Sequence, residues 1–283
     1  MKEVAVIIPH YNDLDRLMRC LEALMAQTDE NVEVVVADNA STVDLTPLRE
    51  AWPEVAIVTQ PKKGAGPARN AGVAATSAPW LMFIDADCVA SPGWLARGRA
   101  IADEAAVIGG RVDVFHETGP PKSGAEAFEE VFAFKMHDYL EKDGYLGSGN
   151  LITSRQVFEK TGGFRSAVSE DKDWSQRAAR AGFHLGFDEE FAVGHPSRQN
   201  WAALRSKWRR LTSERFLLEG RQARASWGLR ALLMPASVIV HVPRVLRSSG
   251  LSMDEKARAL GTLARIRIAR MIWMLGQATT GRP

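Results

Sequence analysis

Two carboxylates stand one residue apart in Asp85-Ala86-Asp87, directly after the apolar run 81–84. Carboxylates at the end of a buried strand can converge on one hard divalent cation, and Mg²⁺ or Mn²⁺ suits such oxygen ligands. The tripeptide alone is weak evidence, because Asp-x-Asp is common in ordinary turns. Its position is stronger evidence, since two carboxylates at the mouth of a buried strand are costly unless something positive binds there.

A glycine-rich segment, residues 64–72, leads into a helical pattern with Arg69 and Asn70 in its first turn. Backbone N–H groups at such a start, together with a guanidinium group, can hold a phosphate. The segment is not a Walker loop, which ends in Gly-Lys-Ser/Thr, and it lacks the Gly-x-Gly-x-x-Gly spacing of dinucleotide-binding loops. An ordinary glycine-rich turn is the alternative.

Acidic residues crowd the first turn of another expected helix, in Glu170-Asp171-Lys172-Asp173. Complementarity with the helix dipole and capping by Ser169 would by themselves explain acids there. The functional alternative is a general base. A carboxylate held near a reacting hydroxyl is what glycosyl or acyl transfer to an alcohol needs.

The elements that must position these residues alternate along the first part of the chain. The continuous apolar runs that predict strands are residues 4–9, 32–37, 55–59 and 80–84. The helical patterns between and after them are residues 14–25, 44–51 and 68–75. Buried strands that alternate with helices predict an α/β fold with a mostly parallel, Rossmann-like sheet flanked by helices. Ligands bind outside the carboxyl ends of such strands, where Tyr11, Asn12, Asp38 and Asp85 fall.

The pattern is less regular beyond residue 105. We expect strands at residues 106–114 and 191–194, and a glycine-rich approach to another strand over 145–153. The expected helices are residues 125–140, 155–160, 169–182, 201–224, 229–246 and 253–275.

Charge divides the chain into an acidic body and a basic tail. The 283 residues are 46% hydrophobic and 25% charged, which excludes collagen-like, low-complexity and wholly disordered classes. Residues 1–195 hold 19 Lys+Arg against 30 Asp+Glu, whereas residues 196–283 hold 17 against 4. Such a tail can meet an anionic surface, either phospholipid or nucleic acid. Neutralisation of the body by the tail is the simpler alternative.

The remaining composition bears on location. The segment MKEVAVIIPHYN has no small-residue cleavage site and is not a secretory signal. No run reaches the roughly 18–20 apolar residues that span a bilayer, so any membrane contact is expected to be peripheral or re-entrant. The two cysteines, Cys20 and Cys88, suggest neither a disulfide framework nor a zinc site, which favours a reducing compartment.

Six segments in order resemble the inverting nucleotide-sugar glycosyltransferases of family 2, which have the GT-A fold. They are residues 6–12, 34–42, 64–72, 83–87, 147–150 and 169–171. The resemblance covers about residues 3–195. Six segments in the family's order are far more specific than any one of them.

The resemblance implies a role for each matching residue. Asp38 would accept a hydrogen bond from the nucleotide base, in a pocket lined by Pro9, Tyr11 and Asn12. Arg69 and Asn70 would lie near the ribose and diphosphate. Asp85 and Asp87 would hold the ribose and a diphosphate bridged by Mn²⁺ or Mg²⁺. His195 would complete the metal shell, although a lone histidine is more often structural.

On the acceptor side, the resemblance makes Asp171 the catalytic base. The sugar and acceptor pocket would include Gly147, Ser148, Gly149, Asn150 and Glu170. This chain has Asn39-Ala40-Ser41 where the family usually has Asp-Gly-Ser. The Gln-x-x-Arg-Trp signature of processive synthases is missing, since the corresponding segment, residues 205–209, reads RSKWR. We therefore expect transfer of a single sugar.

Together these patterns predict a GT-A catalytic domain over residues 1–198 and a basic helical C-terminal extension over 199–283. Residues 1–88 would form the nucleotide-binding half and 89–198 the acceptor half. The expected activity is that of a metal-dependent hexosyltransferase with a UDP-sugar as donor. A hydroxyl of a cell-envelope lipid or saccharide would be the acceptor, as in polysaccharide biosynthesis.

Location and rival functions complete the expectation. The predicted location is cytoplasmic, with the tail at an anionic membrane surface such as the cytoplasmic face of the inner membrane. Packing of the tail on the catalytic domain or on a second subunit is the alternative. A sugar nucleotidyltransferase and a nucleic-acid-binding module are the rival functions, although no nucleic acid is expected as a partner.

Overall fold

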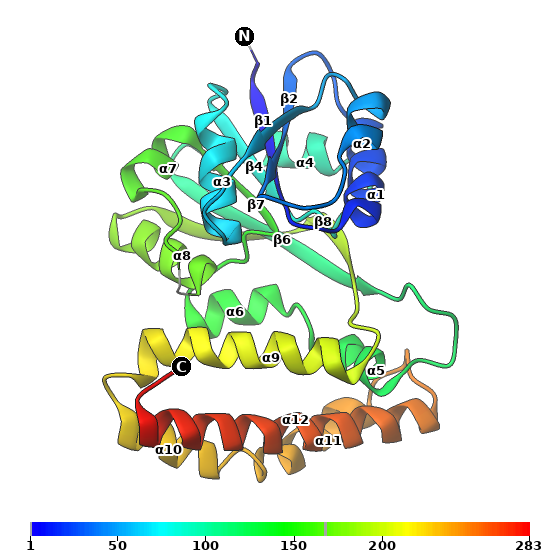
Figure 1. Ribbon diagram of the computed structural model, residues 1–283, viewed down its shortest axis with the longest axis vertical. Coiled ribbons are helices and arrows are strands. Elements are labelled where there is room, and N and C mark those ends of the chain that lie inside the picture. The colour runs from blue at the N-terminus through cyan, green and yellow to red at the C-terminus, as the bar shows by residue number, and fades with distance from the viewer. Residues whose placement is uncertain (1, 167–168) are drawn as a thin grey trace. The chain divides into compact units, whose positions relative to one another are not determined.

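The computed structural model describes residues 2–166 and 169–283 (Figure 1). The chain divides into two compact units. The first comprises Met1–Asp113 and Phe134–His195, and the second comprises Val114–Ala133 and Pro196–Pro283. Each unit contains apolar clusters of its own.

The first unit is built on a mixed sheet. Among the described residues the sheet has eight strands in the order β3-β2-β1-β4-β7-β6-β8-β5. The strands are β1 (Val4–His10), β2 (Val32–Asp38), β3 (Ala56–Thr59), β4 (Trp80–Ile84), β5 (Val89–Ala90), β6 (Ala106–Phe115), β7 (Asn150–Ser154) and β8 (His184–Pro196). Strands β3, β2, β1 and β4 run parallel, whereas β7 is antiparallel to both β4 and β6, and β5 is antiparallel to β8. The expected α/β class with a mostly parallel sheet is confirmed.

Helices cover both faces of this sheet. They are α1 (Leu14–Met25), α2 (Thr46–Ala51), α3 (Ala65–Ala74), α4 (Trp94–Ala100), α6 (Met136–Asp143), α7 (Arg155–Thr161) and α8 (Glu170–Arg180). Alternate side chains of β1 enter different cores, because successive residues of a strand point to opposite faces. Val6 and Ile8 join a cluster that contains α1 and α4 residues, whereas Ala5 and Ile7 join one that contains α3, α7 and α8 residues. Burial on both faces explains why these strands are continuous apolar runs.

Strand register brings the polar residues to one edge of the sheet. His10 is paired with Asp38 across β1 and β2, and Ile84 is paired with Asn150 across β4 and β7. The carboxyl ends of β1, β2 and β4 therefore lie at the same edge as the start of β7. Asp85 follows directly after β4 at this edge.

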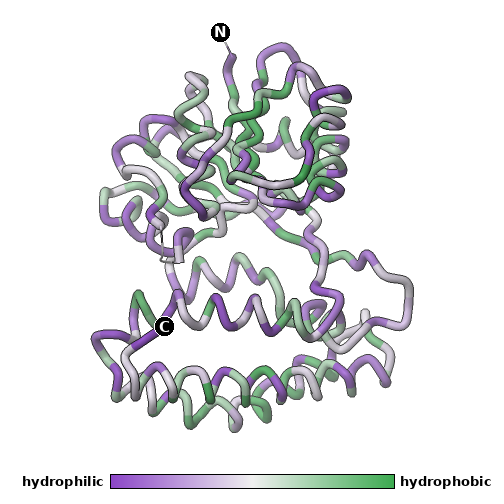
Figure 2. The backbone as a smooth tube through the Cα atoms, in the orientation of Figure 1, coloured by the Kyte–Doolittle hydropathy of each residue, from purple (hydrophilic) through white to green (hydrophobic). Residues whose placement is uncertain are grey.

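The second unit is helical. Its elements are α5 (Gly124–Phe132), α9 (Trp201–Arg215), a π-helical turn η1 (Phe216–Gly220), α10 (Arg224–Leu232), α11 (Ser237–Leu246) and α12 (Met253–Thr280). The long helix α12 contacts α5, α9, α10 and α11. Hydrophobic and hydrophilic residues alternate along these helices (Figure 2), as is usual for helices with one buried face. Within the described ranges no single helix is both long and apolar enough to cross a bilayer. Helices α10 and α11 pass that test only as a pair, and a bend of 54° separates them.

Three expected helices differ from those in the structure. The helix expected over residues 125–140 is interrupted by Phe134, whose φ is +50°, and its two halves, α5 and α6, belong to different units. The helix expected over 229–246 is broken near Pro235, a residue that lacks the N–H of a helix interior. The helix expected over 201–224 loosens into the π-helical turn η1.

The units also divide the chain differently from the expected boundary at 198/199. The division lies at His195 and Pro196, and residues 114–133 belong to the helical unit. The apolar side of α5 accounts for this difference. Ala125 and Phe128 cluster with Leu263 and Ile266 of α12, and with Leu204 of α9.

Candidate active site

A buried pair joins the carboxyl ends of β1 and β2. His10 Nδ1 lies 3.0 Å from Asp38 Oδ1, and the Ser41 N–H donates to Asp38 Oδ2 at 3.0 Å. The Asp13 N–H donates to His10 Nε2 at 3.1 Å, which leaves the ring hydrogen on Nδ1, facing the carboxylate. Burial alone would raise the pKa of Asp38, but the hydrogen bonds from Ser41 and His10 outweigh it and hold that pKa below its usual value. Asp38 is therefore a fixed anion and hydrogen-bond acceptor.

The loops after β1 and β2 hold each other in place. Asn12 Oδ1 accepts a hydrogen bond from the Thr42 N–H at 2.7 Å, and the Asn12 N–H donates to Ser41 Oγ at 2.9 Å. Asn12 and Ala40 adopt left-handed backbone conformations, with φ of +52° and +56°. Tyr11 is 51% exposed, and Lys63 Nζ lies 5.6 Å from its ring centre. An aromatic face and a cation thus stand near the end of β1.

Asn39 fixes the approach to α3. Its amide nitrogen donates to the carbonyl oxygens of Gln60 and Lys62 at 2.9 and 2.8 Å, and its amide oxygen accepts from the Gly64 N–H at 2.7 Å. The departure from the family's usual Asp at this position therefore has a structural role: an amide supplies both the donor and the acceptor that the loop needs. Gly64 has a φ of +126°, a conformation open mainly to glycine.

The guanidinium of Arg69 links α3 to β4 and α8. Nη1 donates to Glu170 Oε1 at 2.7 Å, and Nη2 donates to Asp85 Oδ1 at 2.5 Å. Glu170 Oε2 accepts the Gly66 N–H at 2.9 Å. Arg69 is 3% exposed, and although burial opposes its charge, Asp85 and Glu170 raise its pKa above the usual value. Arg69 thus acts first as a positioning residue for two carboxylates.

Asp85 is also placed by β7. The Asp85 N–H donates to the Gly149 carbonyl at 3.3 Å, and a Cβ on Gly149 would come within 2.5 Å of Asp85 Oδ2. Glycine at 149 therefore leaves room for this carboxylate. The neighbouring Gly147 faces Met136 of α6, whose Cε would lie 3.2 Å from an added Cβ.

Asp171 has the properties of a general base. It lies in the first turn of α8, and Ser148 Oγ donates a hydrogen bond to its Oδ1. Burial raises the pKa of Asp171 to about 6, with Arg69 and the Ser148 hydrogen bond acting against the rise and Glu170 adding to it. A base with a pKa near the working pH is both ionised and able to take a proton.

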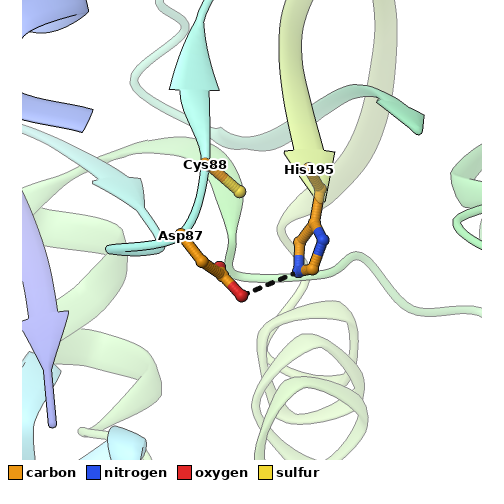
Figure 3. Close-up of side chains that lie close together, drawn as sticks. All are labelled: Asp87, Cys88 and His195. Atoms are coloured by element: carbon orange, nitrogen blue, oxygen red, sulfur yellow. Dashed lines mark ion pairs between the residues drawn. The ribbon is translucent and has the colours of Figure 1, made fainter. Parts of the chain in front are cut away.

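A candidate metal centre lies where β5 meets β8 (Figure 3). Asp87 Oδ2 is 3.2 Å from His195 Nε2, and the ligand atoms of Asp87, Cys88 and His195 lie within 4.8 Å of one another. The ring of Phe134 packs on His195 at 4.3 Å between centres. Burial, with help from Asp87 and Asp85, raises the pKa of the Cys88 thiol well above its usual value, which keeps it protonated. The effective donors are then one carboxylate and one imidazole, a set that fits Mn²⁺ or Mg²⁺ completed by substrate oxygens.

Two expected pocket residues have their polar groups engaged elsewhere. Asn150 is 2% exposed; its Oδ1 accepts from Trp94 Nε1 at 2.9 Å, and its Nδ2 donates to the carbonyls of Arg111 and Phe191. The Asn70 amide exchanges two hydrogen bonds of 2.9 Å with the Phe164 backbone. Both residues therefore hold neighbouring backbone and side chains in place.

Comparison with known proteins identifies the chain. A model described as Glycosyl transferase family 2 matches residues 5–162. The chain belongs to this family. It is thus an enzyme of an inverting glycosyltransferase family that transfers sugar from a nucleotide sugar, which confirms the resemblance of the six segments. The rival expectations of a nucleotidyltransferase and of a nucleic-acid-binding module gain no support.

The chain is similar in sequence to proteins that include AglE and ExoO. Glycosyltransferase AglE of Haloferax volcanii is 28% identical over 217 residues, covering 73% of this chain and 71% of AglE. Succinoglycan biosynthesis protein ExoO of Rhizobium meliloti is 36% identical over 198 residues, covering 68% of this chain. This chain spans only about half of ExoO, 53% of its length.

Solved structures share the GT-A fold at low identity. The mannosyltransferase PcManGT from Pyrobaculum calidifontis, solved with GDP-Man and Mn²⁺, aligns with a TM-score of 0.56 at 17% identity, covering 98% of this chain and 73% of that one. S. aureus TarS 1-349 with UDP-GlcNAc also aligns at 0.56, with 15% identity and coverage of 99% and 92%. A divalent metal is typical of such enzymes, and nucleotide sugars are the donors bound by these neighbours.

Sequence reasoning overlooked two members of the site. His10 was not singled out, yet the parallel register of β1 with β2 places it opposite Asp38. The sequence suggests no zinc site at Cys88, but the structure places its protonated thiol beside the candidate centre. Its adjacency to Asp87 in the sequence was the available signal.

Proposed function

We propose that this glycosyltransferase moves a single sugar, with inversion and with a divalent cation, from a UDP-sugar to a hydroxyl of a cell-envelope lipid or saccharide. The observation that carries the reaction chemistry is the partly buried Asp171, which has a pKa of about 6 and a hydrogen bond from Ser148. This carboxylate stays ionised near neutral pH and can accept a proton from an acceptor hydroxyl.

The nucleotide would bind at the edge formed by β1, β2 and β4. Asp38, held by His10 and Ser41, would accept a hydrogen bond from the base, and the exposed ring of Tyr11 would stack on it. Pro9 and Asn12 would border the same pocket. Asp85 would bind the ribose, in a position maintained by Arg69.

The displacement would follow from these positions. The acceptor oxygen attacks the anomeric carbon as its proton passes to Asp171, and the bond from that carbon to the diphosphate oxygen breaks, releasing the nucleoside diphosphate. Asp87 and His195 would hold the divalent cation, which when bound would neutralise charge on the departing diphosphate. Small residues at 147 and 149, with Ser148 and Glu170, would border the sugar.

The acceptor class and the location are inferred from a relative and from the helical unit. ExoO is named for succinoglycan biosynthesis, which favours a saccharide or lipid-linked acceptor. The helical unit is strongly basic and exposes large apolar side chains on α10 and α11. These features favour peripheral contact with an anionic membrane on the cytoplasmic side. The absence of the processive signature favours transfer of one sugar.

A donor panel tests the proposal. Release of nucleoside diphosphate would be followed for several UDP- and GDP-sugars with Mn²⁺ or Mg²⁺. We expect one preferred donor, a loss of about 10²–10⁴-fold in Asp171→Asn, and a higher Mn²⁺ requirement in Asp87→Asn. Asp173→Asn is the matched control, because Asp173 shares the first turn of α8 but pairs with Arg177. Equal rates for wild type and Asp171→Asn would contradict the assignment of the base.

A further inference from the structure

The helical unit contains a pocket of about 430 Å³ between the ends of α9 and α10, the start of α11 and the middle of α12. Its polar lining is Arg215, Arg230, Arg270 and Ser237, and its apolar lining includes Met234 and Met274. None of these residues belongs to the sugar-transfer site described above.

Among the described residues, three arginines and no carboxylate line the pocket. Arg215 pairs with Glu219 at 3.1 Å, and Arg230 approaches the same carboxylate oxygen at 3.9 Å. Arg267, next to the pocket, donates to Met234 Sδ at 3.8 Å, and no carboxylate of the described residues pairs with it. Arg215 and Arg230 therefore share the carboxylate of Glu219.

Arg270 is the most exceptional of them. Its Nε is buried without a hydrogen-bond partner, and its guanidinium lies over the Trp208 ring at 4.8 Å from the ring centre. Within residues 2–166 and 169–283 no carboxylate forms an ion pair with it. Burial lowers the pKa of Arg270 to about 9, with help from Arg267 and Arg215. A partly buried cation with a buried, unbonded Nε and no anionic partner among the described residues is costly, so its presence points to an anion from outside the chain.

The helices around the pocket expose apolar side chains to solvent. Leu229, Leu232 and Leu233 are about 60% exposed, and Ile239 and Val240 of α11 are about 75% exposed. Figure 2 shows the hydrophobic stretches that α10, α11 and α12 contribute to this unit. Leu233 also lines the pocket. A cationic cavity beside exposed leucine, isoleucine and valine matches a molecule with a phosphate head and a hydrocarbon tail.

We propose that this pocket binds the phosphate of an anionic lipid, with Arg215 and Arg270 as its principal ligands and the hydrocarbon chain against the apolar residues of α10 and α11. The proposal deepens the membrane contact proposed above and rests on it, but not on the identity of the sugar. Guanidinium groups pair with phosphate oxygens through two parallel hydrogen bonds. A phosphomonoester, which can carry two negative charges, fits the excess of arginines better than a singly charged diester.

Vesicle flotation of the full chain tests the proposal. The vesicles would contain phosphatidylcholine alone, or with about 20 mol% of either phosphatidylglycerol or phosphatidic acid. We expect binding to both anionic vesicles and about tenfold tighter binding to phosphatidic acid. Arg270→Met and Arg215→Gln should bring the ratio of the two affinities close to one. Arg209→Gln, which removes an exposed charge from α9, should weaken both affinities alike and leave the ratio unchanged.

Thermal unfolding distinguishes a ligand-binding role of Arg270 from a purely structural one. Arg270→Met should melt at a higher temperature than wild type without lipid, because it removes a partly buried charge and its buried, unbonded Nε. Loss of selectivity in a more stable variant would support the pocket, whereas a variant that melts lower would contradict it.

The remaining outcomes separate the possible failures. No binding to any anionic vesicle would overturn the membrane contact itself. Binding with equal affinities for the two anionic lipids would overturn the pocket and leave the contact standing. Stabilisation by inorganic phosphate at constant ionic strength, without selectivity among vesicles, would assign the pocket to a soluble phosphate and overturn the lipid. RNA binding that is lost in Arg270→Met and Arg215→Gln but kept in Arg209→Gln would also overturn the lipid as the ligand of the pocket.

Discussion

The hydrogen bond from Ser148 to Asp171 sets the pH at which the proposed base becomes active. A bond donated to a carboxylate stabilises its ionised form, so Ser148→Ala should raise the pKa of Asp171 from about 6. A hydrogen bond to a charged group contributes about 1.5–3 kcal/mol. One pKa unit corresponds to about 1.4 kcal/mol, so the lower figure gives a rise of about one unit.

This rise has a specific signature in the rate. At pH 6 the ionised share of Asp171 would fall from about one half to about one tenth, which lowers kcat/KM about fivefold. At pH 8 Asp171 is ionised in both wild type and Ser148→Ala, so their values of kcat/KM should agree within about twofold. The assay is kcat/KM for release of nucleoside diphosphate, measured between about pH 5 and pH 9.

A second buried hydroxyl provides the control. Ser175 Oγ bonds to the backbone of Leu146 and not to Asp171, so Ser175→Ala should leave the acid limb of the pH profile where it is. If the acid limb of Ser148→Ala stays in place or moves to lower pH, then Asp171 is not the group that controls it.

Three further outcomes concern stability. Ala40→Gly should raise the free energy of unfolding in urea by about 0.5–1 kcal/mol, because glycine adopts the φ of +56° without strain. The greater entropy of glycine in the unfolded chain cancels only part of this strain relief. A destabilised variant would refute this. Arg69→Met should lower the free energy of unfolding by about 2–4 kcal/mol, because Asp85 and Glu170 lose the cation that they share. Both carboxylates are partly exposed, so water compensates part of this loss. An unchanged urea midpoint would be incompatible with the ion network. Between its ordinary pKa of 3.8 and about 6, Asp171 binds a proton more tightly in the folded than in the unfolded chain, so folded wild type loses stability as pH rises through that window. Asp171→Asn should therefore melt above wild type at pH 8 but not at pH 4, and equal differences at both pH values would exclude this linkage.

The first four strands were predictable because they are buried on both faces. Continuous, β-branched apolar runs such as 4–9 and 80–84 are typical of strands buried on both faces. The parallel order then brings Asp38 and Asp85 to one edge, which the sequence could also predict. A short parallel strand and its helix are specified by local pattern alone.

Contacts between distant segments were not predictable in the same way. Arg69 pairs with Asp85, 16 residues away, and with Glu170, 101 residues away. Asp87 meets His195 only because β5 pairs with β8. The spacing of apolar residues indicates which face of a helix is buried, but it does not indicate where the helix is interrupted. The apolar pattern runs through Phe134 although the backbone there has a φ of +50°, so the interruption between α5 and α6 left no local signal.

The clustering of α5 with α12 has a consequence for synthesis on the ribosome. Phe128 and Leu263 belong to one apolar cluster, and about 130 residues of chain separate them. At about 5–20 residues per second, α5 emerges roughly 7–25 s before the segment that covers it. During that interval α9 can cover part of this aromatic side but α12 cannot, while the β1 to β4 region can already pair. Nascent chains stalled on the ribosome before residue 253 should therefore recruit a chaperone that binds hydrophobic segments. Chains in which α12, up to residue 280, has left the ribosome should no longer recruit it.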